Sequence, residues 1–520
     1  MRRDVMLERA RDTNKAWDFL VIGGGATGVG VACDAASRGY GVLLLEQSDF
    51  GKGTSSRSTK LVHGGVRYLQ QGNIPLVMEA LKERGRLRRN APHLVKDLAF
   101  VVPNYVWWEA PFYGIGMKVY DALAGKYGFG HSRNLSREET IERLPTIETE
   151  GLRGGVMYHD GQFDDARLLI DLAQTAAGQG AALLNYTRVT KLVKDAQGFV
   201  VGVEAEDGES GETLRATGKV VVNATGPFAD GIRQMDDPAA QAMIRPSQGV
   251  HLVLPRSFLG GESAIMVPHT DDGRVLFAIP WHGVVVVGTT DTPVADVSLE
   301  PQPLTDEVEF LLTHAARYLT RDPAPGDVLS CFAGLRPLVG SGDDEDTASL
   351  SRDHTLQVSK SGLMTITGGK WTTFRKMAED TVDHGIVLGE LEPRECVTRE
   401  LNLHGFHTHP ERFGALSVYG SDAPAVEALL SSDPKLGEPL HPRLDARAGE
   451  VIWAVRQEMA RTVDDVLARR TRSLLLDARA AAEAAPGVAR LMADELGRSQ
   501  SWARSQASEF QELAAGYFLE

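Results

Sequence analysis

The stretch WDFLVIGGGATGVGVACDAASRGYGVLLLE (residues 17–46) decides the fold. It contains a short apolar run at residues 17–22, a glycine-rich turn, a helix-forming segment at residues 26–38 and a second apolar run at residues 41–45. An order of strand, turn, helix and strand is typical of a parallel sheet whose strands are joined by right-handed crossovers. The sequence therefore predicts an α/β fold that begins here.

Three glycines and one acidic residue in this stretch form a dinucleotide-binding pattern. Gly23, Gly25 and Gly28 make G-x-G-x-x-G directly after the first apolar run, and Glu46 ends the second. The first glycine permits a tight turn, the second lets the backbone approach a pyrophosphate, and the third packs helix against strand. The carboxylate accepts a hydrogen bond from a ribose hydroxyl, while the helix N-terminus favours the phosphates. The pattern does not distinguish FAD from NAD.

The segment that follows, TSSRSTKLVHGGVRY (residues 54–68), is dense in hydroxyls and glycines. Thr54, Ser55 and Ser58 can satisfy pyrophosphate oxygens, and Gly64 with Gly65 would allow close approach to a flat ring. The alternative is a surface loop whose hydroxyls cap helices.

Later segments predict two further layers. Strand-like runs at residues 183–185, 199–205 and 219–224 would join the first sheet from distant parts of the chain. Runs at residues 250–254, 275–280 and 284–288, separated by Gly, Pro and Asp, predict an antiparallel sheet that covers the substrate. Helix-forming residues dominate 450–476 and 478–496, which predicts a helical C-terminal domain, and residues 340–346 (GSGDDED) predict an exposed acidic loop.

The composition is that of an ordinary globular protein, with 42% hydrophobic and 24% charged residues in a chain of 520. At roughly 100 to 200 residues per domain, this length predicts two or three domains. The net charge of −15 argues against nucleic acid as a partner, because nucleic-acid phosphates are bound mainly by Lys and Arg. Cys33, Cys331 and Cys396 are too scattered for a disulfide framework or a metal cluster, so we expect a reducing compartment and no metal.

The sequence predicts a cytoplasmic location, and peripheral contact with the inner face of the membrane is a further hypothesis. Residues 1–15 do not resemble a secretory signal, and no apolar run reaches the roughly 18 to 20 residues of a membrane-spanning helix. Aromatic and basic residues crowd into residues 104–130, a mixture suited to the membrane boundary, although the aromatic side chains would equally suit the protein's own core. These residues are Trp107, Trp108, Phe112, Tyr113, Tyr120, Tyr127 and Phe129, with Lys118 and Lys126.

Several motifs in order along nearly the whole chain resemble the FAD-dependent glycerol-3-phosphate dehydrogenases, relatives of the α-glycerophosphate oxidases. The resemblance rests on GGGATG (23–28), TSSRSTKLVHGGVRYLQ (54–70), DGQFDDARL (160–168), VVNATGPFAD (221–230), VGTTDTP (287–293), FAGLRPL (332–338), SRDHTL (351–356), GGKWTTFRKMAED (368–380) and DDVLARRTR (464–472).

The resemblance implies a glutathione-reductase-like FAD-binding Rossmann domain, an antiparallel β-rich substrate domain and a C-terminal helical domain. The FAD-dependent region would span residues 16–390. Its FAD domain would be built from about 16–90, 150–245 and 330–390, and its substrate domain from about 91–149 and 246–329. The helical domain would occupy residues 391–520.

The same resemblance implies the contacts to FAD. Val189 would meet the adenine, Ala224 and Gly226 would flank the nucleotide, and residues 369–372 would lie along the flavin. The full implied set is Gly23, Gly25, Ala26, Thr27, Gly28, Glu46, Gln47, Thr54, Ser55, Ser58, Lys60, Val189, Ala224, Gly226, Gly369, Lys370 and Thr372.

The implied reaction is oxidation of sn-glycerol 3-phosphate to dihydroxyacetone phosphate, which requires hydride transfer from C2 to the flavin and removal of the hydroxyl proton. Arg67, Arg336 and Lys370 lie in motifs resembling the family's substrate pocket, where cations would bind the phosphate. His63 is the first candidate for the base, because an imidazole titrates near neutral pH. The alternatives for the base are His251 and Lys370. The residues expected to line the pocket are Tyr68, His251, Thr289 and Arg352.

The family resemblance favours a membrane quinone as electron acceptor. The closest alternative is an oxidase that releases hydrogen peroxide, and a non-catalytic flavin-binding module is a more distant one. A pyridine-nucleotide reductase would need a second G-x-G-x-x-G after a strand, which the sequence lacks. The oligomeric state stays open, with a homodimer as one alternative.

Overall fold

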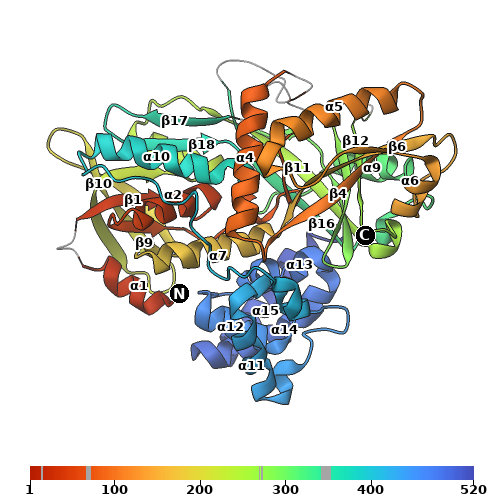
Figure 1. Ribbon diagram of the computed structural model, residues 1–520. Helices are drawn as coiled ribbons and strands as arrows, with labels where there is room; N and C mark the ends of the chain where they lie inside the picture. The colour runs from red at the N-terminus through yellow and green to blue at the C-terminus, as the bar shows by residue number, and fades with distance from the viewer. Residues whose placement is uncertain are drawn as a thin grey trace.

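The computed structural model describes residues 1–12, 16–65, 69, 72–268, 270, 273–340 and 353–519. Two sheets lie side by side, and the helices of the C-terminal segment pack beneath both of them (Figure 1). This arrangement confirms the predicted class, an α/β FAD-type fold with a β-rich second domain and a helical C-terminal domain.

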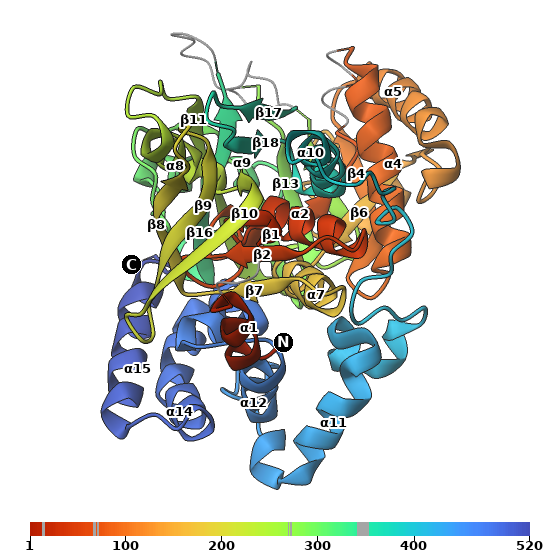
Figure 2. The same ribbon diagram turned by 90° about the vertical axis from the view of Figure 1, so that its left-hand side faces the viewer.

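Within the described residues, the first sheet has eight strands. Its central strand β1 (Trp17–Ile22) pairs in parallel with β10 (Thr213–Asn223) on one side and with β2 (Val42–Leu45) on the other. Helix α2 (Ala26–Ser37) packs on β1 and β2 and contacts α7 and α10 (Figure 2). The remaining elements of this layer are α1 (Arg3–Ala10), α7 (Asp165–Gly178), α8 (Ala229–Asp236), α10 (Phe374–Leu388), β7 (Ala182–Leu184), β8 (Thr187–Lys194), β9 (Val200–Asp207), β17 (His354–Val358) and β18 (Met364–Gly368).

The described part of the chain forms a second sheet of ten strands, in which nearly all pairs are antiparallel. The exception is β12 (Ala264–Val267), which pairs in parallel with β4 (Val95–Asn104). Three strands come from segments expected in the FAD domain, namely β3 (Leu61–Val62), β6 (Gly154–Phe163) and β16 (Ser330–Val339). The other elements are β5 (Arg133–Leu135), β11 (Ile244–Pro255), β13 (Leu276–Trp281), β14 (Val284–Gly288), β15 (Thr292–Pro293), α4 (Ile74–Asn90), α5 (Glu109–Ala124), α6 (Arg137–Arg143) and α9 (Thr305–Ala316).

The C-terminal domain shares a hydrophobic core with the second sheet. Val253, Trp281 and Phe332 of the sheet pack with Val466 and Leu474 of the helical segment. The helices are α11 (Ala423–Ser432), α12 (Ala448–Gln457), a π-helix (Asp465–Arg470), α13 (Ser473–Leu476), α14 (Ala478–Leu496) and α15 (Gln500–Ala515).

Helix α14 has the bounds that its composition predicted, but the predicted helix at residues 450–476 is broken. Met459 and Arg472 have φ angles of +59° and +60°, which an α-helix does not tolerate. The charged side chains between them are drawn into buried ion pairs with the first sheet's loops, so tertiary contacts override the local helix propensity. The acidic loop predicted at residues 340–346 lies, beyond Gly340, outside the described residues.

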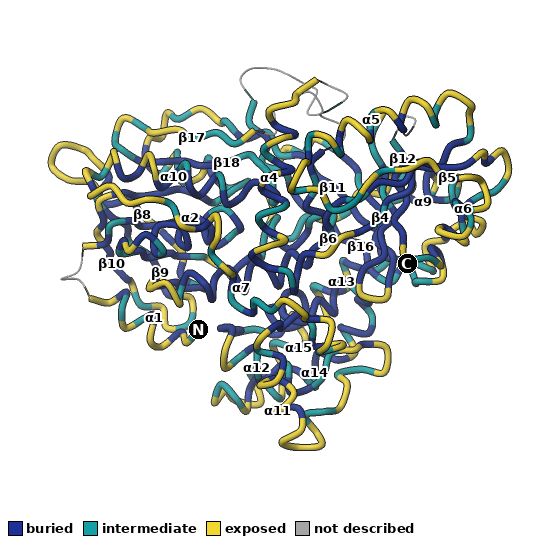
Figure 3. Tube along the Cα trace, viewed as in Figure 1, coloured by how far each residue is buried: buried dark blue, intermediate teal, exposed yellow. Residues whose placement is uncertain are grey.

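Burial follows the two sheets, which are dark in Figure 3, while exposed positions concentrate on the outer helices and loops. Cys33 and Cys331 are buried and all three cysteines are free. Across the described residues, no helix is both long enough and apolar enough to cross a bilayer.

Candidate active site

A cavity of about 560 Å³ lies at the carboxyl ends of β1, β2 and β10, where Ile22, Leu45 and Ala224 line its wall. Ligands of parallel α/β sheets bind at this edge. Most of the predicted FAD contacts line the same cavity, although they come from segments far apart in the sequence. They are Gly23, Gly25, Ala26, Thr27, Glu46, Gln47, Thr54, Ser55, Ser58, Val189, Ala224, Gly226, Gly369, Lys370 and Thr372.

Two glycines of the turn are required by close approaches of the backbone, and the third lies at the cavity wall. Gly23 has a φ of +109°, and a Cβ there would lie 2.6 Å from the Ala224 carbonyl oxygen. A Cβ on Gly28 would lie 2.0 Å from the carbonyl oxygen of Gly23, so Gly28 packs the helix against the turn and does not itself line the cavity. Gly25 has ordinary backbone angles and lies at the cavity wall, immediately before α2. The space that its missing side chain leaves is therefore available to a ligand.

Glu46 is held at the cavity by two backbone donors. Its carboxylate accepts hydrogen bonds from the Gly24 N–H at 2.6 Å and the Ser48 N–H at 2.8 Å. Burial raises the pKa of Glu46, and these two bonds partly offset the rise. The carboxylate thus fixes the glycine turn at the wall of the cavity.

Hydroxyls of the segment at residues 54–58 line the cavity and also bond to other parts of the protein. Ser55 Oγ accepts a hydrogen bond from the Ala26 N–H at 2.9 Å, beside the start of α2. Ser58 lines the cavity, but its Oγ donates to Asp165 at 2.7 Å.

Lys60 was expected to contact the cofactor, but the structure pairs its ammonium group with Asp165. It is fully buried and is not among the residues that line the cavity. Its Nζ lies 2.8 Å from both carboxylate oxygens of Asp165. A buried ammonium needs a counter-charge, and Asp165 supplies it.

The turn between β18 and α10 closes the other end of the cavity. Trp371 Nε1–H donates to the Ser55 carbonyl at 2.8 Å, and the His63 N–H donates to Thr372 Oγ1 at 3.2 Å. Residues 369–372, predicted to lie along the flavin, therefore contact both the hydroxyl segment and the candidate base. Trp371 lies within this predicted range and inside the GGKWTTF motif, although sequence reasoning assigned it no role of its own.

A second cavity of about 150 Å³ adjoins the first. Both are lined by Thr59, Leu61, His63 and Arg336, so these residues stand at their boundary. The smaller cavity also includes the predicted Thr289, together with Asp160, Arg274 and Asp291, which the sequence did not single out. Its size suits a small molecule at the end of a dinucleotide.

The guanidinium of Arg336 is held in place by the second sheet. It donates to Thr289 Oγ1 at 3.1 Å and to the Thr290 carbonyl at 2.9 Å, and it lies 3.4 Å from Asp291. A Cβ on Gly249 would lie 2.3 Å from Arg336 Nη2, so a larger residue there would displace the guanidinium. Arg336 is thus a fixed cation at the boundary between the cavities.

A chain of hydrogen bonds fixes the turn that carries His63. The Gly64 N–H donates to Tyr120 Oη at 2.8 Å, and the Tyr120 hydroxyl donates to Asp160 at 2.7 Å. Arg84 donates to the same carboxylate at 2.6 Å. Burial, and then the charge of Asp160, raise the pKa of Tyr120 well above its usual value, so the phenol stays a donor. The sequence placed Asp160 in a motif but gave it no role.

His251 lines the larger cavity but is buried. Its Nε2 lies 2.9 Å from Thr59 Oγ1, and its ring stacks on Phe332 with centroids 4.8 Å apart. Burial, followed by the charges of Arg336 and Lys60, lowers the pKa of His251 well below its usual value. His251 is therefore neutral and a weak proton acceptor. The predicted Arg67, Tyr68 and Arg352 lie outside the described residues.

Comparisons with known proteins identify the family of the chain. The family described as FAD dependent oxidoreductase matches residues 18–375, and the C-terminal domain of alpha-glycerophosphate oxidase matches residues 364–503. A probable mitochondrial glycerol-3-phosphate dehydrogenase of Caenorhabditis elegans is 41% identical over 97% of this chain and 74% of its own length. The mitochondrial glycerol-3-phosphate dehydrogenase of Homo sapiens is 40% identical over 95% of this chain and 72% of its own.

Solved structures extend the similarity to three dimensions. The glycerol-3-phosphate dehydrogenase from Bacillus halodurans, complexed with FAD, is 30% identical, with a TM-score of 0.80 over 99% of this chain and 97% of that one. The L-alpha-glycerophosphate oxidase from Mycoplasma pneumoniae, 18% identical with a TM-score of 0.57, shares the fold. The cavity at the glycine turn and the matches over nearly the whole chain lead to one assignment: this protein belongs to the family of FAD-dependent glycerol-3-phosphate dehydrogenases.

Proposed function

We propose that the protein oxidises sn-glycerol 3-phosphate to dihydroxyacetone phosphate with FAD as cofactor, and that the electrons pass to a membrane quinone. The observation that carries this proposal is the placement of His63 and Arg336 at the boundary between a dinucleotide-sized cavity and a smaller one. The relatives' names supply the substrate, and the two side chains supply chemistry that suits it.

The residues present fit FAD. Gly25 leaves the space before α2 open, and the first N–H groups of a helix favour a pyrophosphate at that place. When bound, FAD supplies the group that accepts the hydride from C2. The chain itself must hold the substrate carbon close to the ring, exclude water and remove one proton.

His63 is our candidate for removing that proton. Its imidazole would accept the proton of the C2 hydroxyl as the carbonyl forms, while the hydrogen on C2 leaves as hydride. The proton then stays on the ring nitrogen. The hydrogen bonds from its own backbone to Thr372 and from Gly64 to Tyr120 hold the turn in one conformation. A fixed base needs less reorganisation in the transition state.

Arg336, together with Lys370, which also lines the larger cavity, is our candidate for binding the substrate phosphate. Because Thr289 and Thr290 already fix its guanidinium, little side-chain entropy is lost when an anion binds. Replacing Arg336 with alanine should lower kcat/KM for glycerol 3-phosphate by roughly tenfold or more, since a charge-assisted hydrogen bond contributes about 1.5 to 3 kcal/mol. Steady-state kinetics with a dye acceptor measure the loss.

The control for this prediction is Arg256→Ala, which removes an arginine paired with the exposed Glu262. Its kcat/KM should match that of the wild type. An equal loss by Arg336→Ala toward glycerol, which has no phosphate, would contradict a phosphate-binding role.

One anaerobic experiment tests the reaction and the acceptor together. Glycerol 3-phosphate is mixed with the purified protein without oxygen, and the flavin spectrum should bleach. Quinone or oxygen is then added to separate samples. Rapid recovery with quinone and slow recovery with oxygen supports the dehydrogenase, whereas rapid recovery with oxygen and stoichiometric peroxide supports the oxidase alternative. Failure to bleach contradicts the proposed substrate.

We further propose that α5 carries the contact with a lipid surface. Phe112 (54% exposed), Ile115 (68%) and Val119 of α5 are exposed, and so are Trp107 (75%) and Trp108 in the turn that leads into it. Tyr113 and Tyr120 of the same segment are instead buried, so the aromatic residues that the sequence grouped together divide between the outer face and the core. Lys118 and Lys126 are exposed on this segment. Apolar and basic groups together suit an anionic membrane surface.

Replacing Trp107 and Trp108 with serine should weaken this contact. Wild-type protein should float with vesicles of phosphatidylcholine and phosphatidylglycerol and reduce a quinone embedded in them, while the double variant should do both poorly. Its FAD content and anaerobic flavin reduction should stay normal, because neither tryptophan lines the site.

The matched control replaces two exposed apolar residues elsewhere, Phe199→Ser and Val387→Ser. This variant should float like the wild type. Flotation of the Trp107→Ser/Trp108→Ser variant at the wild-type level would remove α5 as the docking surface.

A further inference from the structure

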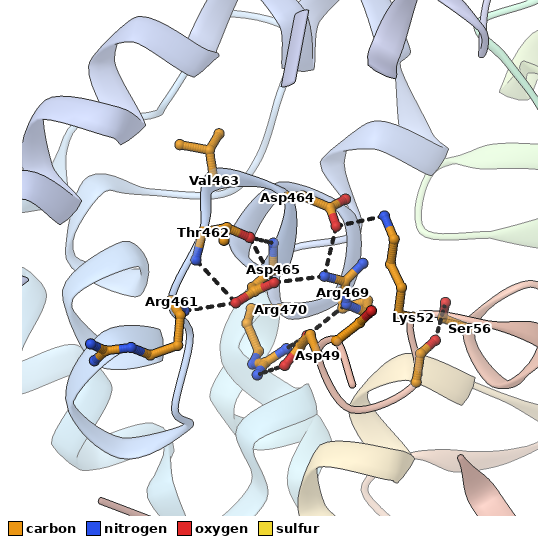
Figure 4. Close-up of polar contacts among 12 residues, drawn as sticks. Asp49, Lys52, Ser56, Arg461, Thr462, Val463, Asp464, Asp465, Arg469 and Arg470 are labelled. Carbon is orange, nitrogen blue, oxygen red and sulfur yellow. Dashed lines mark hydrogen bonds and ion pairs between the residues drawn. The ribbon is translucent and has the colours of Figure 1, made fainter. Parts of the chain in front are cut away.

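Beneath the cofactor cavity, charged residues of three parts of the chain meet in what we name the junction. It joins the loop after β2, the segment after β15 and the π-helix of the C-terminal domain. Figure 4 shows the contacts between the loop after β2 and the π-helix. Its members are Asp49, Lys52, Arg57, Glu300, Asp464, Asp465, Arg469 and Arg470.

Asp49 anchors the C-terminal domain to the loop that leaves β2. Its carboxylate is fully buried and receives Arg469 Nε at 2.6 Å together with Arg470 Nη1 at 2.6 Å and Nη2 at 2.9 Å. Burial disfavours the ionised form, but the two guanidinium groups outweigh it and keep the pKa of Asp49 below its usual value. Asp49 therefore fixes where the loop lies against the π-helix.

Lys52 and Arg57 are the members of the junction that also line the cofactor cavity, and Lys52 is the one that pairs directly with the C-terminal domain. Its Nζ lies 2.8 Å from Asp464 Oδ2 and forms an ion pair with Glu300. Glu300 in turn receives Arg57 at 2.6 Å and the Tyr517 hydroxyl at 2.8 Å. Lys52 is thus held at the cavity wall by two carboxylates, Asp464 of the C-terminal domain and Glu300 of the segment after β15.

The loop between these anchors carries cavity-lining residues on both sides of Lys52. Gly51, Gly53, Thr54 and Ser55 all line the cavity, and Ser55 accepts the N–H at the start of α2. The Gly51 N–H donates to the Gly24 carbonyl at 3.1 Å, which ties the loop to the glycine turn. A shift of Lys52 would therefore be transmitted to the wall that faces the pyrophosphate.

We propose that Asp464 of the C-terminal domain is a positioning residue for FAD, acting through Lys52 to keep the loop of residues 49–55 in its cofactor-binding conformation. The helical domain thereby takes part in retaining the cofactor. The proposal rests on FAD binding in the cavity and is independent of the substrate.

The direction in which FAD affinity changes distinguishes a positioning role of Asp464 from a purely electrostatic one. The cofactor's diphosphate is anionic, so removing a nearby carboxylate would tighten FAD binding if Asp464 acted only as a charge. Loss of a positioning contact should weaken binding instead. Asp464→Asn should raise the dissociation constant of FAD about tenfold, the effect expected from one charge-assisted contact.

A double-mutant cycle tests whether Asp464 acts through Lys52. Apoprotein of the wild type, Asp464→Asn, Lys52→Met and the double variant is titrated with FAD, and flavin fluorescence is followed. Lys52→Met should weaken binding to a similar extent, and Asp464→Asn should add less than about twofold in the Lys52→Met background. Asp464→Glu and Lys52→Arg, which keep the charges, should recover part of the affinity.

Controls distinguish this role from general destabilisation. Glu495→Gln breaks an ion pair with the half-exposed Arg456 in the same domain and should leave FAD affinity unchanged. The unfolding temperature of each apoprotein is recorded separately. Unchanged or tighter FAD binding by Asp464→Asn, or an equal effect in the Lys52→Met background, overturns the proposal. If Asp464→Asn does not fold, wild-type affinity in Lys52→Met alone overturns it.

Discussion

Replacing Gly25 with valine should yield a folded protein that is purified without FAD. Gly25 lies at the cavity wall, and a Cβ there would already lie 3.2 Å from Ser55 Oγ. The methyl groups of valine would occupy the space before α2 where the backbone must approach the pyrophosphate. The φ of −80° at this position is open to any residue, so the backbone itself is not strained.

The measurement is the ratio of flavin to protein absorbance after purification, with circular dichroism to confirm folding. Gly178→Val is the matched control, because a Cβ at Gly178 would meet nothing within 4 Å and this glycine does not line the cavity. The control should keep one FAD per chain. Stoichiometric FAD in Gly25→Val would show that the cofactor does not use this turn.

The first part of the fold was predictable because its signals are local. The apolar run of β1, the glycines and the helix of α2 follow one another within residues 17–46, and each has a steric requirement that only certain residues meet. Helix α14 was likewise predicted to the residue, since helix-forming residues at helical spacing mark it without help from distant segments.

The errors arose where distant partners decide the outcome. Lys60 lies within a motif of cofactor contacts, yet Asp165, more than a hundred positions away, binds its ammonium. The predicted helix at residues 450–476 breaks because Asp49 recruits Arg469 and Arg470. Composition cannot reveal such pairings, because each depends on a contact that exists only after the chain has folded.

Replacing His63 with asparagine should slow anaerobic flavin reduction by a factor of roughly 10² to 10⁴, the usual cost of removing a general base. FAD content should stay normal, because the substitution keeps the backbone N–H that bonds to Thr372. The side chain that it changes lies where the two cavities meet. Substrate affinity should change little, since Arg336 and its partners remain. Stopped-flow spectroscopy with glycerol 3-phosphate measures the rate.

The dependence of that rate on pH identifies the base. In the wild type the rate should rise between about pH 5 and 8 as an imidazole loses its proton, and this rise should disappear in His63→Asn. His251→Gln is the matched comparison, because His251 also lines the larger cavity but is buried, and burial lowers its pKa well below the usual value of an imidazole. Its variant should keep the pH dependence even if loss of the stack on Phe332 slows the reaction. Unaltered reduction kinetics in His63→Asn would move the role to His251 or Lys370.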